Sequence, residues 1–226
     1  SHNPATALPL LDRGDIDPRS TPPEGVDWLI RMASAQADAT ARLRDLALLT
    51  LLSDCGLRSQ EAASVQLRDL DLDGETLLVR KGKRNKARRV PLPDIAVRRF
   101  RDYLRVRCPD WPLETGHEHE QEPLLIARQV AKPGQPWEPG MKTVSMRKML
   151  HELGRDAAAR VREQAKKEPS VSRVGELHRI ADRLEEVSPH RLRHGLAYRL
   201  KQSQVPLEDI GRVLGHSKPQ ITTVMY

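Results

Sequence analysis

The stretch from residue 188 to residue 226, SPHRLRHGLAYRLKQSQVPLEDIGRVLGHSKPQITTVMY, constrains this chain most. Ser188-Pro189 is a strong helix start, because serine suits the N-cap and proline suits the first helical position. His190 and Arg193 then share one face of the first turns, beside backbone N–H groups and the positive end of the helix dipole. Leu192, Leu196 and Leu200 form an apolar stripe that we expect to be buried. The start of this helix is therefore predicted to be a position where a phosphate can bind.

Composition points to a polyanionic partner. The 226 residues suffice for one ordinary domain with a core, and the net charge is +7. Such a charge favours nucleic acid or an acidic membrane. No apolar run approaches the roughly 20 residues of a membrane span, and nothing resembles a signal peptide, so a membrane is the weaker alternative. Aromatic residues make up 3% of the chain, which argues against stacking on single-stranded bases and favours double-stranded nucleic acid.

The ligand types needed for a metal site are poorly placed. Cys55 and Cys108 are the two cysteines, too few for a four-thiolate zinc site or a disulfide scaffold, and they favour a reducing, cytoplasmic setting. The run at 117–120, His-Glu-His-Glu, has polar flanks and is interpreted as a solvated loop. His190 and His194 are spaced for one helix face, but Arg193 between them would repel a cation. We therefore expect neither a metal nor a cofactor.

Periodicity and turn signals predict a mainly α fold with a small antiparallel β-sheet (α+β). Residues 1–23 carry five prolines among polar residues and are interpreted as a linker or tail, which leaves 24–226 as the folded domain. Helices are expected to about residue 35, through 43–51 to an end near 55, and over 59–65, 94–107 and 143–154, with two more beginning at 188 and 206. Strands are expected at 76–79 and 88–92, forming a hairpin with a basic tip at 83–86, and at 124–126.

Two further motifs supply cations. Gly56-Leu57-Arg58-Ser59-Gln60-Glu61 places an arginine just after a glycine suited to end a helix. By itself this arginine could be a surface residue at a helix end, and Glu61 an ordinary glutamate on a helix surface. The second motif is the hairpin, KGKRNKARRVPL, whose lysines could simply contact phosphates.

Taken together, these motifs resemble the catalytic domain of the tyrosine recombinases, the phage-integrase family of DNA strand-exchange enzymes. The resemblance rests on GLRSQE, the hairpin ending in VPL, SPHRLRH, LGH at 214–216 and TTVMY at 222–226, and it extends from about Thr21 to Tyr226. In that family the step from the first arginine to the HxxR motif is usually shorter than the 132 positions here. We therefore interpret the charge-dense stretch at about 155–187 as a solvated helix-loop-helix insertion in the catalytic domain, 24–226.

The resemblance implies a role for each matching residue. Tyr226 would be the nucleophile that forms a 3′-phosphotyrosyl bond with DNA. The transition-state phosphorane would be held by Arg58, Arg193, His190 and His216, with His190 also the base. Lys83 would protonate the departing 5′ oxygen, with Lys86 as the main rival. Glu61 would hold an arginine or histidine in place, and Lys81, Lys86 and Arg88 would contact DNA.

The implied partner is double-stranded DNA. The full-length protein is expected to act as a tetramer on DNA, and the isolated domain to be a monomer. Two alternatives remain open: a type IB topoisomerase, which uses similar groups, and a non-catalytic DNA-binding regulator on the same fold.

Overall fold

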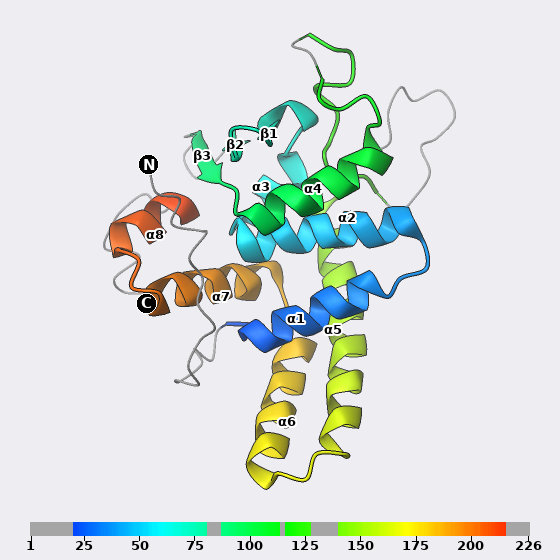
Figure 1. Cartoon of the computed structure of the whole chain (residues 1–226), viewed down its shortest axis with the longest axis vertical. Coiled ribbons are helices and arrows are strands. Elements are labelled where there is room, and N and C mark those ends of the chain that lie inside the picture. Colours follow the sequence, from blue (N-terminus) through cyan, green and yellow to red (C-terminus); the bar gives the residue numbers. More distant parts are fainter. Residues whose placement is uncertain (1–19, 81–86, 114–115, 128–139, 216–226) are drawn as a thin grey trace.

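The computed structural model describes residues 20–80, 87–113, 116–127 and 140–215. As predicted, these residues form a mainly helical fold with a small antiparallel sheet, and the strand order in that sheet is β1-β2-β3 (Figure 1). The helices are α1 (Pro23–Ser34), α2 (Ala39–Leu49), α3 (Ser59–Ser64), α4 (Asp94–Arg107), α5 (Thr143–Ala165), α6 (Val171–Glu185), α7 (Pro189–Gln202) and α8 (Leu207–Leu214). The strands are β1 (Leu70–Asp71), β2 (Thr76–Val79) and β3 (Arg88–Pro91).

The helical core is built around α2. This helix packs against α1 on one side and α4 on the other (Figure 1). Its chain continues past Leu49 as one π-helical turn, Thr50–Asp54, and then reaches Gly56, whose φ of +64° ends the helical segment. The predicted end near residue 55 is confirmed, because glycine adopts this left-handed conformation at little cost. The fully buried side chains of Leu48, Phe100 and Tyr103 fill the space between the helices.

The sheet differs from the sequence expectation in two places. The predicted hairpin is present, with Leu77 opposite Val90, and β1 adds a short edge strand that the sequence did not predict. The strand predicted at 124–126 is wrong. In the described chain this stretch makes two isolated bridges, Gln66 with Pro123 and Ile126 with Gly140. It switches from one neighbouring segment to another, so no ladder develops.

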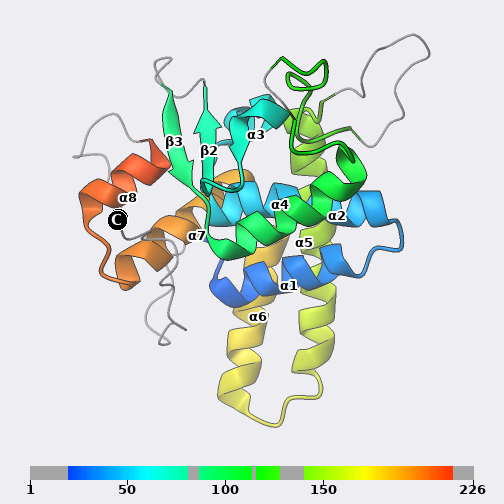
Figure 2. The same ribbon diagram turned by 45° about the horizontal axis from the view of Figure 1, so that its top comes forward.

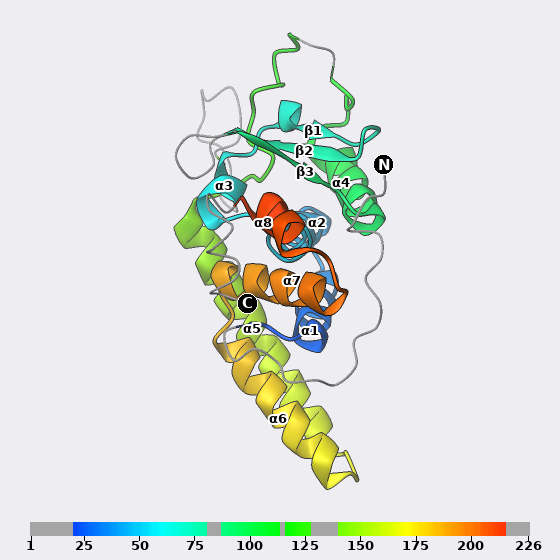
Figure 3. The same ribbon diagram turned by 90° about the vertical axis from the view of Figure 1, so that its left-hand side faces the viewer.

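Helices α5 and α6 form a long hairpin that projects away from the sheet (Figure 3). The helix predicted to end near 154 continues to Ala165, and α6 follows after a short connection. A helix-loop-helix is thus present at 155–187, but it is not solvated on all sides, because its facing surfaces belong to the main hydrophobic core. The buried residues include Leu153, Ala157, Val161, Leu177, Ile180 and Leu184. Whether the hairpin is an insertion stays a prediction.

The described residues also bear on two alternatives from the sequence, a membrane-spanning segment and a metal site. None of the helices within the described ranges is both long and apolar enough to cross a membrane. In the loop at 117–120, His119 pairs through Nδ1 with Glu122 at 2.7 Å. A group of three or more metal-binding side chains does not occur among the residues that the structure describes.

Candidate active site

Helix α7 begins as its sequence predicts. The Ser188 hydroxyl accepts a hydrogen bond from the Arg191 backbone N–H at 3.3 Å, and Pro189 is the first helical residue. The predicted apolar stripe, Leu192, Leu196 and Leu200, is buried. Farther along, the buried guanidinium of Arg199 donates to the Ser53 carbonyl and lies 3.7 Å from the Asp54 carboxylate. These contacts fix α7 against the π-helical turn, so the start of α7 has a defined place next to Gly56.

Arg193 lies at the centre of the site. It is 4% exposed, and its two terminal nitrogens donate to the carbonyls of Gly56 and Leu214. Gly56 can approach this closely because it lacks a Cβ, which would lie 2.8 Å from the side chains of Leu196 and Leu214. Arg193 thus joins the start of α7 to the turn before α3 and to the end of α8.

Arg58 is the N-cap residue of α3, the helix that the sequence predicted over 59–65. Its backbone N–H donates to Glu61 Oε2 and its Nη1 to Glu61 Oε1, both at 2.9 Å. Its Nη2 lies 3.5 Å from the Gly215 carbonyl, and the side chain is 34% exposed. Arg58 therefore has a side chain that is both held in place and open to a ligand.

Arg88, on β3, was expected to contact DNA, but in the structure its side chain binds other parts of the protein. Its Nη1 and Nη2 donate to the two carboxylate oxygens of Glu61, each at 2.9 Å, and its Nε donates to the Val213 carbonyl at 3.3 Å. The side chain is 12% exposed. A contact between Arg88 and DNA stays a prediction, but its present partners all belong to the protein.

Glu61 is therefore shared by two arginines. Burial acts to raise the pKa of Glu61, but hydrogen bonds from Arg88 and from the Arg58 backbone N–H, together with both positive charges, outweigh it. The net effect lowers the pKa from 4.5 to about 2. The carboxylate is ionised across the physiological range and holds both guanidinium groups, rather than lying free on a helix surface.

At the end of α8, three consecutive carbonyls each accept a hydrogen bond from a different arginine. Val213 accepts from Arg88, Leu214 from Arg193 and Gly215 from Arg58. The carbonyls that end a helix lack intrahelical donors and carry the negative end of the dipole, so three cations are well placed there. Figure 2 shows α8 beside β3 and next to α7, the elements that supply two of these arginines.

His190 lies one turn before His194 on α7. The two Nε2 atoms are 2.8 Å apart and the rings meet edge to face, while His190 is exposed and His194 is 2% exposed. Partial burial lowers the pKa of His190 below 6.5, and the charges of Arg193 and Arg58 lower it further. Both arginines therefore act on His190, which stays neutral near pH 7 and can accept a proton.

The described residues thus bring together Arg58, Glu61, His190 and Arg193 from the predicted set, and Arg88 joins them through Glu61. The other predicted site residues, Lys81, Lys83, Lys86, His216 and Tyr226, lie outside the residues that the structure describes. The contact of His194 with His190 was not predicted from the sequence. Their spacing of four residues on one helix face was the signal, but it was weighed only as a metal site.

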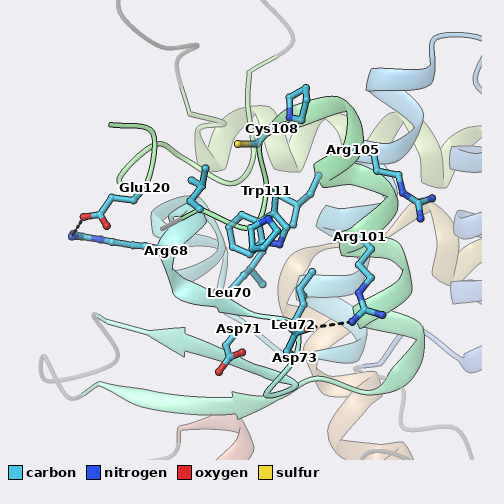
Figure 4. Close-up of a pocket in the computed structure, with 14 residues that line it drawn as sticks. Arg68, Leu70, Asp71, Leu72, Asp73, Arg101, Arg105, Cys108, Trp111 and Glu120 are labelled. Carbon is cyan, nitrogen blue, oxygen red and sulfur yellow. Dashed lines mark hydrogen bonds and ion pairs between the residues drawn. The ribbon is translucent and has the colours of Figure 1, made fainter. Parts of the chain in front are cut away.

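A separate cavity of about 430 Å³ lies between β1, α4 and the segment around Trp111 (Figure 4). Its walls combine apolar side chains, such as Leu70 and Leu72, with ion pairs at the rim, such as Arg101 with Asp73 at 3.3 Å. Of the predicted site residues that the structure describes, none lines it. The candidate active site is accordingly the arginine cluster, which consists of Arg58, Arg88 and Arg193 with Glu61 and His190. The cavity beside Trp111 is not part of it.

Comparison with known proteins identifies relatives over nearly the whole chain. The chain is 29% identical over 222 residues to a tyrosine recombinase XerC of Alcanivorax borkumensis, covering 98% of this chain and 60% of the relative. It is 26% identical over 207 residues to a tyrosine recombinase XerA of Pyrococcus furiosus, covering 92% and 56% respectively. The chain thus spans about 60% of the length of such relatives.

Solved structures share the fold. A crystal structure of XerA recombinase superposes with a TM-score of 0.64 at 21% identity, covering 93% of this chain and 61% of the other. The XerH site-specific recombinase bound to its difH substrate in a pre-cleavage complex gives 0.61 at 18% identity, covering 92% and 50%. The sequence model of the phage integrase family matches residues 26–226, which include the arginine cluster and the tyrosine motif. The chain therefore belongs to the phage integrase family.

Proposed function

We propose that this chain cuts and rejoins double-stranded DNA as the catalytic domain of a site-specific tyrosine recombinase. The observation that carries the proposal is the meeting of Arg58, Arg193 and His190 at the start of α7, where two cations lie beside a neutral imidazole. The relatives named tyrosine recombinases, and the solved site-specific recombinase bound to its difH substrate, support the same activity.

In the proposed reaction the Tyr226 oxygen attacks a DNA phosphodiester. The P–O bond to the 5′ oxygen breaks, a 3′-phosphotyrosyl bond forms and a 5′-hydroxyl is released. Attack by the 5′-hydroxyl of a partner strand reverses these steps and reseals the DNA. The number of phosphodiester bonds is conserved, so no nucleotide cofactor is needed.

Each side chain has a chemical task in this scheme. Arg58 and Arg193 stabilise the negative charge on the equatorial oxygens of the phosphorane, for which planar guanidinium groups are suited. His190 takes the phenolic proton, and His216 donates a hydrogen bond to the scissile phosphate. Lys83 protonates the departing 5′ oxygen, with Lys86 as the rival for that role.

The assembly follows from the same proposal. The full-length protein acts in the cytoplasm as a tetramer on two duplexes, and the isolated domain is a monomer that binds DNA mainly through phosphates. Lys81 and Lys86 supply part of that binding, so affinity falls steeply as salt rises.

The test is covalent capture of the protein on nicked suicide duplexes, screened from the DNA that flanks the gene. The parent chain should give a protein–DNA adduct that survives denaturation. Tyr226→Phe removes one oxygen and should abolish the adduct while duplex binding persists. Tyr198→Phe makes the same change on α7 and should keep the adduct. An adduct that persists in Tyr226→Phe would refute the assignment of the nucleophile.

A further inference from the structure

The side chain of Arg88 is committed to the protein itself. Its terminal nitrogens donate hydrogen bonds to both carboxylate oxygens of Glu61, and its Nε donates to the Val213 carbonyl. The Arg88 side chain is 12% exposed. Such a bidentate pair needs the planar fork of a guanidinium, and the third contact needs Nε in the same plane. Lysine at this position would keep the charge but could not make the three contacts together.

These contacts link β3, α3 and α8. Glu61 is 4% exposed and also holds Arg58 by its side chain and its backbone N–H. A Cβ on Gly215 would lie 2.8 Å from the guanidinium carbon of Arg88, so the guanidinium packs directly against that residue. Loss of Arg88 would remove one of the three arginine contacts to the end of α8 and would leave Arg58 as the sole cation that hydrogen-bonds Glu61 within the described structure.

We propose that Arg88 is a positioning residue for strand cleavage: it holds Glu61 so that Arg58 and the end of α8 keep their places beside Arg193. This inference rests on the proposed function and assigns Arg88 a task within it, in place of the DNA contact expected from the sequence. The residue that follows this turn in the sequence is His216, one of the predicted site residues.

Arg89 offers a matched control. It is the next residue on β3 and carries the same charge, but successive residues of a strand point to opposite faces. Arg89 is exposed and makes one long hydrogen bond, from Nη1 to the Thr76 hydroxyl at 3.4 Å. Removing this side chain takes away one positive charge from the same strand without touching Glu61.

The experiment compares Arg88→Lys, Arg88→Ala and Arg89→Ala in the full chain, on the duplex that gives an adduct with the parent. Two quantities are measured: the rate of adduct formation at saturating protein, and the slope of log affinity against log salt. We expect both Arg88 variants to lose about 10- to 100-fold in rate, since small misplacements of catalytic groups have costs of that order. Arg88→Ala should keep the salt slope of the parent, and Arg89→Ala should stay within about threefold of its rate.

The outcomes separate the two roles of Arg88. A phosphate contact tolerates lysine, so an Arg88→Lys variant with the rate of the parent would overturn the positioning role. A salt slope smaller by about one in Arg88→Ala would do the same, because it reports one lost phosphate contact. If the parent itself forms no adduct, the proposed function fails and the positioning role fails with it. Arg88→Lys retains the positive charge beside Glu61, and its far-ultraviolet circular dichroism checks that it is folded.

Discussion

Gly154 lies where α5 packs closely against the end of α6, and its substitution tests the packing of the hairpin. A Cβ at this position would lie 2.2 Å from the backbone oxygen of Leu184 and 2.6 Å from Val187 Cγ1. A backbone oxygen cannot move aside as a flexible side chain can, so Gly154→Ala has to push the two helices apart.

The magnitude follows from two opposing terms. Alanine in a helix interior is favoured over glycine by about 1 kcal/mol. Overpacking a well-filled core costs about 1–3 kcal/mol, and a clash with backbone belongs at the upper end. The free energy of unfolding should therefore fall by about 2 kcal/mol, which lowers the Tm by about 4–8 °C for a chain of this size.

Gly175 provides the control on the same hairpin. It lies within α6, and a Cβ there would meet nothing within 4 Å. Gly175→Ala should therefore raise the free energy of unfolding by up to about 1 kcal/mol. Urea denaturation followed by circular dichroism measures both variants. If Gly154→Ala is as stable as the parent, or if both substitutions change stability in the same direction, the proposed close approach of α5 and α6 is refuted.

Two further predictions concern ionisation. Because the pKa of Glu61 is lowered from 4.5 to about 2, its contribution of about 3 kcal/mol is present above pH 4.5 and lost as the pH falls towards 2. Unfolding measured against pH should show this loss in the parent but not in Glu61→Gln; parallel curves would contradict it. Burial and the charges of Arg193 and Arg58 keep the pKa of His190 below 6.5, so its NMR titration should move towards 6.5 in Arg58→Ala. A midpoint at or above 6.5 in the parent would contradict this account.

Local signals predicted much of the fold. The helix expected at 94–107 is α4 to the residue, and Ser188-Pro189 begins α7. The hairpin around Val90 has the expected pairing, and the glycine at position 56 ends its helical segment with a positive φ. Each of these features depends on residues within a few positions of one another, through caps, turns and apolar periodicity. For the same reason, the motifs carrying Arg58, His190 and Arg193 could be recognised without coordinates.

Contacts between residues far apart in the sequence could not be predicted from such local signals. The sequence predicted that Glu61 would hold an arginine or histidine, but not that it would bind Arg58 and Arg88 together, the latter 27 positions away. It assigned Arg88 to DNA because basic residues near a hairpin tip usually contact phosphates. It also predicted a strand at 124–126, where the chain instead passes between two separate neighbours. The sequence shows that an arginine is positively charged, but which group it binds depends on the elements that pack beside it. Here the packing of α8 against α7 and β3 brings three terminal carbonyls to three guanidinium groups.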